Sequence, residues 1–104
     1  MQIVRAPGAL GGVEVRSDYD DQMLRALACE SIAAEHGFTA REQEIALLLG
    51  QKKTNLQIEK QLVIAQGTLK AHINHIYAKL DVHSRAEFYG VLEGRERRIA
   101  EEGR

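Results

Sequence analysis

The chain has one proline, one cysteine and no tryptophan among its 104 residues, and it has no long apolar run. A single cysteine, Cys29, cannot form an internal disulfide, which fits a reducing compartment such as the cytoplasm. The lack of 18 consecutive apolar residues argues against a membrane-spanning helix, and the N-terminus lacks the basic-then-apolar order of a signal peptide. We therefore expect a cytoplasmic protein whose residues make no membrane contact.

A strong excess of positive charge is also missing. The formal net charge is −1, whereas generic nucleic-acid-binding proteins are strongly basic. The distribution is uneven, since residues 1–38 hold three Arg and six acidic residues, and residues 39–92 hold seven Lys or Arg and five acidic residues. If DNA is the partner, this small local excess predicts that one copy binds weakly and loses affinity quickly as salt rises.

The first part of the chain divides into two segments. Residues 1–19 contain the only proline and three glycines without any sustained periodicity, which predicts a flexible N-terminal segment. From Asp20 to His36, apolar residues recur at helical spacing, and Gly37 follows as a candidate C-terminal cap. Residues 20–37 are therefore predicted to form an additional helix or linker, whose apolar side carries Met23, Leu27, Cys29, Ile32 and Ala33.

Helix starts are marked three times after Gly37. Each mark is a Ser or Thr followed three residues later by Glu or Gln, a pattern in which both residues satisfy free N–H groups at a helix start. The pairs are Thr39 and Glu42, Thr54 and Gln57, and Ser84 and Glu87. They predict helices near 40–50, 55–62 and 85–93, and a fourth is expected at 66–80. The predicted fold is all-α, with four short helices sharing one core over residues 38–94.

Residues 66–80 have two different faces. Leu69, Ile73, Ile76 and Leu80 form an apolar stripe at steps of four, three and four residues. The opposite face is small and polar, with Lys70 on its flank, and it consists of Ala71, Asn74, His75 and Ala78. Short side chains let a helix backbone approach base edges, so this face suits the major groove of DNA.

Only residues 63–65 separate the second and third predicted helices of the domain. A connection this short forces a sharp corner, as in a helix-turn-helix, although ordinary packing of two helices gives the same spacing. The small polar face of residues 66–80 favours the DNA-binding interpretation.

At this point the chain resembles a known family. Residues 38–87, FTAREQEIALLLGQKKTNLQIEKQLVIAQGTLKAHINHIYAKLDVHSRAE, are similar without a gap to the LuxR-type DNA-binding domain, also called the GerE or FixJ/NarL type. The likeness covers roughly residues 38–92. The segment HIYAKLDVHS, residues 75–84, also resembles the C-terminal domains of certain actinobacterial members that follow a membrane-embedded sensor. The matching positions are Thr39, Arg41, Glu42, Asn55, Ile58, Thr68, Lys70, His72, Ile76, Lys79, Leu80, Val82 and Arg85.

The resemblance implies a transcriptional regulator that binds double-stranded DNA as a homodimer, with the third domain helix in the major groove. Lys70, Ala71 and Asn74 would read bases, since Lys can donate to guanine, Asn can pair with adenine, and Ala can touch a thymine methyl. The fourth helix would form the dimer contact through Phe88, Tyr89, Val91 and Leu92, a set that also looks too apolar for one short helix to bury alone. Phosphate contacts are expected from Asn55, Thr68, His75, Tyr77 and Lys79.

Three residues depart from the family pattern. Glu59 replaces a small Ala in the second helix, Lys52 replaces a glycine in the first turn, and Ala65 replaces the serine that caps the recognition helix. The helix predicted at 66–80 is therefore the only one of the four without a capping side chain. Such a loss costs on the order of 1 kcal/mol of stability. We expect a competent fold with modest DNA affinity. The departures also favour an alternative function, a degenerate module or anti-activator that dimerises with a relative without reading DNA.

Other chemistry has weaker support in the sequence. His72 and His75 lie three residues apart and His83 follows, but no Cys or carboxylate stands at a ligand spacing beside them, so packing or phosphate contact is favoured over a metal site. Cys29 lies on an apolar stripe and is interpreted as a packing residue. Residues 95–104, with Arg95, Arg97 and Arg98 among four Glu from position 93 onward, are predicted to form a charged, self-paired tail. No catalytic motif, cofactor site or small-molecule site is identified, so an enzyme is not expected.

Overall fold

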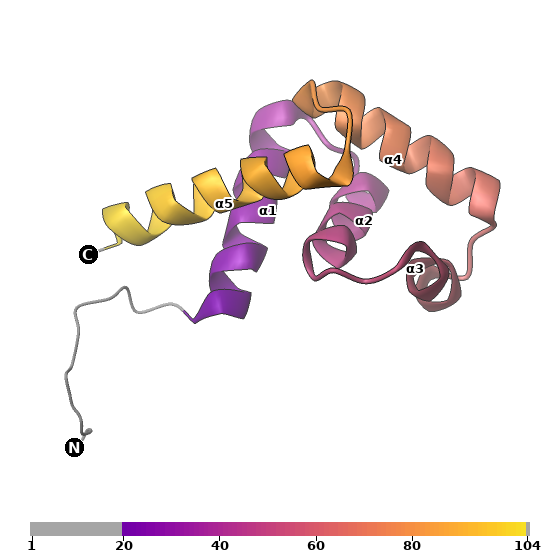
Figure 1. Cartoon of the computed structure of the whole chain (residues 1–104), viewed down its shortest axis with the longest axis horizontal. Helices are drawn as coiled ribbons and strands as arrows, with labels where there is room; N and C mark the ends of the chain where they lie inside the picture. Colours follow the sequence, from indigo (N-terminus) through magenta and orange to yellow (C-terminus); the bar gives the residue numbers. More distant parts are fainter. Residues whose placement is uncertain (1–19, 104) are drawn as a thin grey trace, which may run out of the picture.

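The computed structural model describes residues 20–103, and all regular elements within that range are α-helices (Figure 1). The prediction of a flexible segment at residues 1–19 lies outside the described residues. The predicted all-α fold with an additional N-terminal helix is confirmed. The five helices are α1 (Asp21–His36), α2 (Ala40–Gly50), α3 (Asn55–Leu62), α4 (Gln66–Leu80) and α5 (Arg85–Glu102).

Local capping explains where four of the helices begin. The side chains of Asp20, Thr39, Thr54 and Ser84 each accept a hydrogen bond from the backbone N–H three residues later. The predicted reciprocal bonds form at α2 and α3. At α5 the return bond differs, because the Glu87 carboxylate accepts from the backbone N–H of His83 at 2.8 Å instead. Each cap satisfies donors that the first helical turn leaves free.

All five helices contribute to one hydrophobic core. Of the apolar stripe predicted on α4, Leu69 and Ile76 are buried, and Ile73 and Leu80 are half-buried. Phe88 of α5 is fully buried beside the ring of Tyr77. Burial of side chains of this size is the main favourable contribution to folding. The largest fully buried side chains are Ile32, Ile45, Leu49, Ile58, Leu69, Ile76, Phe88 and Leu92.

Helix α1 packs against both α5 and α2 (Figure 1). It ends as predicted at Gly37, whose φ of 69° and ψ of 41° place it in the left-handed conformation that glycine adopts without strain. Ala28, Cys29, Ile32 and Ala33 form its buried side. The predicted apolar side is wrong at Met23, which remains 47% exposed.

Helix α5 is longer than the sequence predicted. The pattern indicated an end near residue 93, whereas α5 continues to Glu102, and the charged residues after 94 belong to it. The prediction that these charges pair among themselves is also wrong for Arg95 and Glu96. Arg95 donates to Ser31 and pairs with Glu35, and Glu96 accepts from Arg25, so both bind α1. Within residues 20–103, no helix is long and apolar enough to cross a membrane.

Candidate nucleic-acid interface

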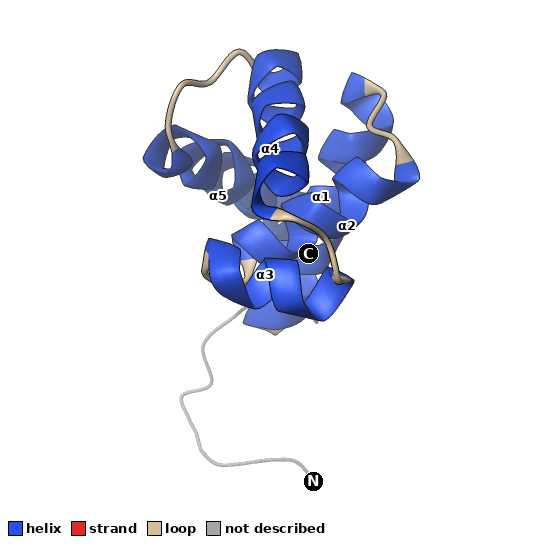
Figure 2. Cartoon of the chain, turned by 90° about the vertical axis from the view of Figure 1, so that its right-hand side faces the viewer, coloured by secondary structure: helices blue, strands red, loops and turns tan. Residues whose placement is uncertain are grey.

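Helices α3 and α4 share the face of the molecule that is turned toward the viewer in Figure 2. The corner between them is tight. Val63 ends α3 with a left-handed backbone, Ile64 is half-buried, and Ala65 precedes α4 in an extended conformation. The backbone N–H of Ile64 donates to the Glu59 carbonyl at 3.0 Å, which closes the turn. This is the geometry of a helix-turn-helix.

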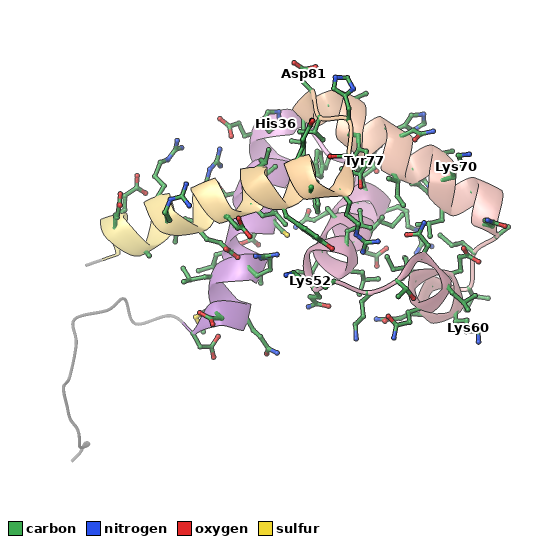
Figure 3. The ribbon with its side chains drawn as sticks, in the orientation of Figure 1. His36, Lys52, Lys60, Lys70, Tyr77 and Asp81 are labelled. Atoms are coloured by element: carbon green, nitrogen blue, oxygen red, sulfur yellow. The ribbon has the colours of Figure 1, made fainter. Side chains whose placement is uncertain are left out.

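The outward face of α4 is the small polar face that the sequence predicted. Lys70, Ala71 and Asn74 are all exposed, as are His75 and Ala78. Figure 3 shows Lys70 on the side of α4 that points away from the other helices. Below this face, Leu69 and Ile76 are buried and fix the rotation of the helix about its axis. The groups predicted to read bases are therefore held together at the surface.

An ion pair joins the C-terminal half of α4 to the start of α2. The Lys79 ammonium donates to Glu42 Oε1 at 2.6 Å and to the Gly37 carbonyl at 3.0 Å. Glu42 is only 4% exposed, and the hydrogen bond from Lys79 holds the pKa of its carboxyl below the ordinary value. Lys79 was predicted to contact a DNA phosphate, but its ammonium is used inside the chain in this structure.

The other predicted phosphate contacts differ in exposure. Asn55, Thr68 and His75 are exposed, and His75 Nδ1 lies 4.0 Å from Glu42 Oε2. Tyr77 is half-buried, with its ring centroid 6.0 Å from that of Phe88, and burial raises the pKa of its hydroxyl. Asn55, Thr68 and His75 therefore present their polar atoms most openly.

The connection between α2 and α3, residues 51–54, adds basic groups that the sequence analysis did not assign to the site. We call it the 51–54 loop. Lys52 is exposed and Lys53 is half-buried, and the loop leads directly to Asn55. Arg85 of α5 holds its far end, because its guanidinium donates to the Lys53 carbonyl and, at 3.4 Å, to Asn55 Oδ1. Two lysines immediately before a capped helix start were the available sequence signal.

Comparison with known proteins identifies the family. The GerE family model, described as bacterial regulatory proteins of the luxR family, matches residues 36–92, which is more than half of the chain. The chain belongs to the luxR family. This confirms the resemblance inferred from the sequence, and it supports a DNA-binding regulatory domain with a helix-turn-helix.

Relatives within the luxR family are named as regulators. The chain is 40% identical over 58 residues to the transcriptional regulatory protein LiaR of Bacillus subtilis, which covers 56% of this chain and 28% of LiaR. It is 35% identical over 75 residues to a putative HTH-type transcriptional regulator of Aeromonas salmonicida, and this alignment covers 70% of this chain and 38% of the relative. It is 38% identical over 63 residues to the uncharacterized response regulatory protein YgeK of Escherichia coli, and this alignment covers 57% of this chain and 43% of YgeK. The chain thus spans less than half the length of these relatives. No solved structure matches it.

The departures from the luxR-family pattern have visible structural consequences. Lys52 stands where the family has glycine, and its φ of 66° explains the family's preference, since glycine enters this region without strain. Its ammonium lies 5.3 Å from the centroid of the Tyr89 ring. Ala65 makes no side-chain cap for α4, as predicted. Glu59 is half-buried on α3.

The residues predicted at the luxR-type dimer contact need correction. Phe88 and Leu92 are 0% and 1% exposed because α1 and the other helices already enclose them. They belong to a set of apolar side chains that were expected to be too many for one short helix to bury, but both are buried in the core of this chain. Tyr89 and Val91 are half-buried and pack against the same core. The roles of Tyr89 and Val91 in a dimer contact stay a prediction, because both side chains remain partly exposed.

Within residues 20–103, no group of three or more His, Cys, Asp or Glu is arranged to hold a metal ion. Cys29 is buried in the core, and burial raises the pKa of its thiol to about 11. A thiol in that state is a poor nucleophile at neutral pH. Cys29 therefore contributes to packing.

Proposed function

We propose that this chain is the sequence-specific DNA-binding part of a bacterial transcriptional regulator, with α4 in the major groove. The observation that carries the proposal is the outward face of α4, where Lys70, Ala71 and Asn74 are exposed together above a buried apolar stripe. Lys can donate to guanine O6 or N7, and Asn can form a paired contact with adenine. Ala71 keeps the backbone close to the base edges.

Phosphate contacts on both sides of α4 would set its register on the duplex. Asn55 and the 51–54 loop supply exposed polar and basic groups at the start of α3, and Thr68 and His75 supply others along α4. Such contacts position a helix without specifying sequence. Because few of these groups are basic, we expect weak binding by one copy and steep loss of affinity with salt.

We also propose that the chain binds DNA as a homodimer through the outward face of α5. Ala86, Gly90, Glu93 and Arg97 are exposed on this face, at spacings that place them on one side of the helix. A Cβ built on Gly90 would meet no atom within 4 Å, so another helix can approach closely there. The face carries charges of both signs, which suits the self-complementary contact of a two-fold dimer.

A second candidate is a luxR-type module that dimerises with a relative without reading DNA. The uncapped start of α4 at Ala65 favours it, since that end of the helix lies in the part proposed to enter the groove. Selection of bound duplexes from a random pool, at low and high salt, separates the two functions. Recovery of an inverted repeat supports the DNA-reading regulator. Recovery of no common sequence at either salt concentration contradicts it.

A further inference from the structure

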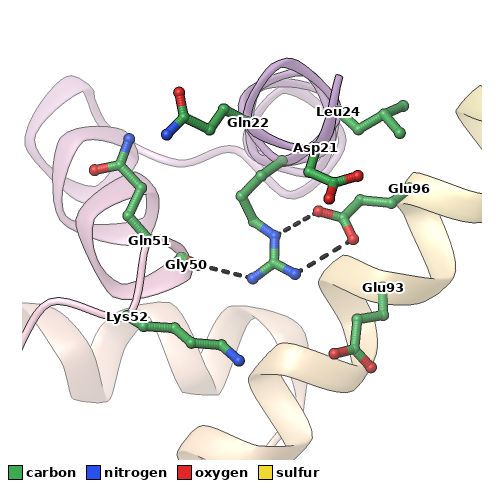
Figure 4. Close-up of a pocket in the computed structure, with 9 residues that line it drawn as sticks. Asp21, Gln22, Leu24, Gly50, Gln51, Lys52, Glu93 and Glu96 are labelled. Carbon is green, nitrogen blue, oxygen red and sulfur yellow. Dashed lines mark hydrogen bonds and ion pairs between the residues drawn. The ribbon is translucent and has the colours of Figure 1, made fainter. Parts of the chain in front are cut away.

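Nearly all of helix α1 lies before the residues that match the luxR family, since only His36 is included. One of its side chains nevertheless reaches the end of α2. The Arg25 guanidinium donates to the Gly50 carbonyl at 2.7 Å and forms a two-bond ion pair with Glu96 of α5 (Figure 4). Both partners are mostly shielded, with side chains only 16% and 18% exposed. Arg25 therefore links three helices through one planar group, a geometry that lysine cannot reproduce.

Gly50 is the residue from which the 51–54 loop begins. A Cβ at this position would lie 3.2 Å from Arg25 Cδ and 3.0 Å from Leu92 Cδ1, so α1 and α5 both pack directly on this backbone. Beside it is a cleft of about 440 Å³ whose lining includes Gln51, Lys52 and Glu93. The 51–54 loop therefore borders solvent-accessible space on this side. Arg25 donates the hydrogen bond to Gly50, the residue that directly precedes the loop.

The loop is held at both ends by an arginine. Arg25 binds the carbonyl of Gly50 at the start, and Arg85 binds the carbonyl of Lys53 at the other end. Between them, the Lys52 and Lys53 amides donate back to Leu49 and Leu48 at 2.9 and 3.1 Å. Lys52 is kept at a positive φ, a conformation that persists in a non-glycine residue when its surroundings enforce it.

We propose that Arg25 is a positioning residue for DNA binding, which couples α1 to the 51–54 loop, one of the segments proposed above to contact phosphate. This inference rests on the proposed DNA-binding function. Arg25 touches no DNA itself. It fixes the end of α2 so that Lys52, Lys53 and Asn55 are presented in one arrangement, and a movement of α1 would thereby change DNA affinity.

Arg95 provides a matched control. It also joins α5 to α1, through Ser31 at 2.7 Å and Glu35, and within residues 20–103 it forms no hydrogen bond or ion pair with α2 or the 51–54 loop. Arg25→Met and Arg95→Met each remove one arginine bridge between the same two helices. A purely structural role predicts the same consequences for both variants.

The test combines amide hydrogen exchange with duplex binding, using the full chain and a random-sequence duplex at several salt concentrations. For Arg25→Met we expect the Lys52 and Lys53 amides to exchange about threefold to tenfold faster relative to the α2 core, and duplex affinity to fall by about the same factor, as for loss of one hydrogen bond. Arg95→Met should change neither. If Arg25→Met does not fold, Arg25→Lys replaces it and should show the same changes to a smaller degree.

Equal loop exchange in the Arg25 and Arg95 variants would overturn the proposal, as would faster exchange without loss of duplex affinity. If the unaltered chain binds no duplex at any salt concentration, the proposed function fails, and the coupling to DNA fails with it. The exchange rates then still decide whether Arg25 holds the loop. The two failures are therefore distinguishable.

Discussion

At the scale of single residues, Val63 is the most strained position in the helix-turn-helix. It is β-branched, yet its φ of 54° and ψ of 55° place it in the left-handed region, which is unfavourable for such a side chain. It is also 87% exposed, so burial returns little of this cost. The short connection between α3 and α4 requires the conformation, because the Ile64 amide must reach the Glu59 carbonyl.

Replacing Val63 should therefore stabilise the chain. Asn tolerates the left-handed conformation, so we expect Val63→Asn to raise the free energy of unfolding by about 0.5 to 1 kcal/mol. Urea denaturation measures the change. Leu56→Asn is the control, since Leu56 is exposed but lies within α3. A gain of the same size in the control, or no gain at Val63, would show that the backbone strain is not the cause.

Residue roles on the surface were predictable from sequence to a limited extent. The exposed face of α4 followed from periodicity alone, because Leu69 and Ile76 fix which side is buried. The ion pair between Lys79 and Glu42 could not be predicted in this way, because the two residues are 37 positions apart and only the packed fold brings them together. The burial of Phe88 was missed for the same reason, because only the packed fold brings residues of other helices, such as Tyr77 of α4, around it.

At the scale of helices, the starts were predictable and one end was not. Thr39, Thr54 and Ser84 mark helix starts through bonds that span three residues, so the sequence contains the whole interaction. The last turns of α5 depend instead on α1. Arg95 and Glu96 bind side chains 60 or more residues away, and no local pattern contains those contacts.

The missing cap of α4 predicts a simple stabilising change. Ala65 has the extended backbone of an N-cap residue, with φ of −74° and ψ of 156°, but it has no side-chain acceptor. We expect Ala65→Ser to raise the free energy of unfolding by about 1 kcal/mol. Ala40→Ser at the already capped start of α2 is the control and should bring no gain. Equal stability of Ala65→Ser and the unaltered chain in urea would mean that the cap does not form.

The contact between α2 and α4 predicts a dependence of stability on pH. Lys79 holds the pKa of Glu42 below its ordinary value near 4.5, and His75 lies 4.0 Å from the same carboxylate. A carboxyl with a lowered folded-state pKa stabilises the fold above its ordinary pKa, and this contribution is lost as pH falls through the lower folded value. The ion pair should therefore strengthen the α2–α4 contact at neutral pH.

Glu42→Gln tests this expectation. The variant should be less stable than the unaltered chain at pH 7, and the difference in free energy of unfolding should shrink as the pH is lowered below 4.5. Glu44→Gln on the same helix removes an exposed carboxylate that pairs with Arg41, and it should change stability little at any pH. Chemical denaturation across this pH range gives both curves. A difference that stays constant with pH would exclude the ion pair as its origin.

At the scale of the whole molecule, α1 and α5 pack together on the side of the molecule away from α3 (Figure 1). Phe88 and Leu92 of α5 are buried in the core, and the outward face of α5 is exposed. The additional helix thus belongs to the same core as the luxR-type domain. The sequence indicated the helix but did not indicate its position against α5.

The proposed dimer predicts a variant that remains folded but monomeric. Gly90→Arg adds a long side chain where a Cβ meets no atom, so we expect unchanged helical content and loss of the dimer on DNA. Ala26→Arg, on the exposed side of α1, is the control and should still dimerise. Sedimentation of the chain with a duplex carrying two half-sites measures the stoichiometry. Two copies of Gly90→Arg bound with unaltered affinity would place the dimer contact elsewhere.

The central claim is that Lys70 and Asn74 read bases while the basic residues around them only position α4. Its most direct test is the affinity of Lys70→Ala and Asn74→Ala for a selected duplex and for a random-sequence duplex. Lys60→Ala is the control, because Lys60 is an exposed basic residue on α3 and lies outside the outward face of α4. We expect the first two variants to lose roughly 1 to 3 kcal/mol of binding free energy on the selected duplex only, with unchanged helical content. Lys60→Ala should affect both duplexes equally. Equal losses on both duplexes for Lys70→Ala and Asn74→Ala, or no loss at all, would contradict the account.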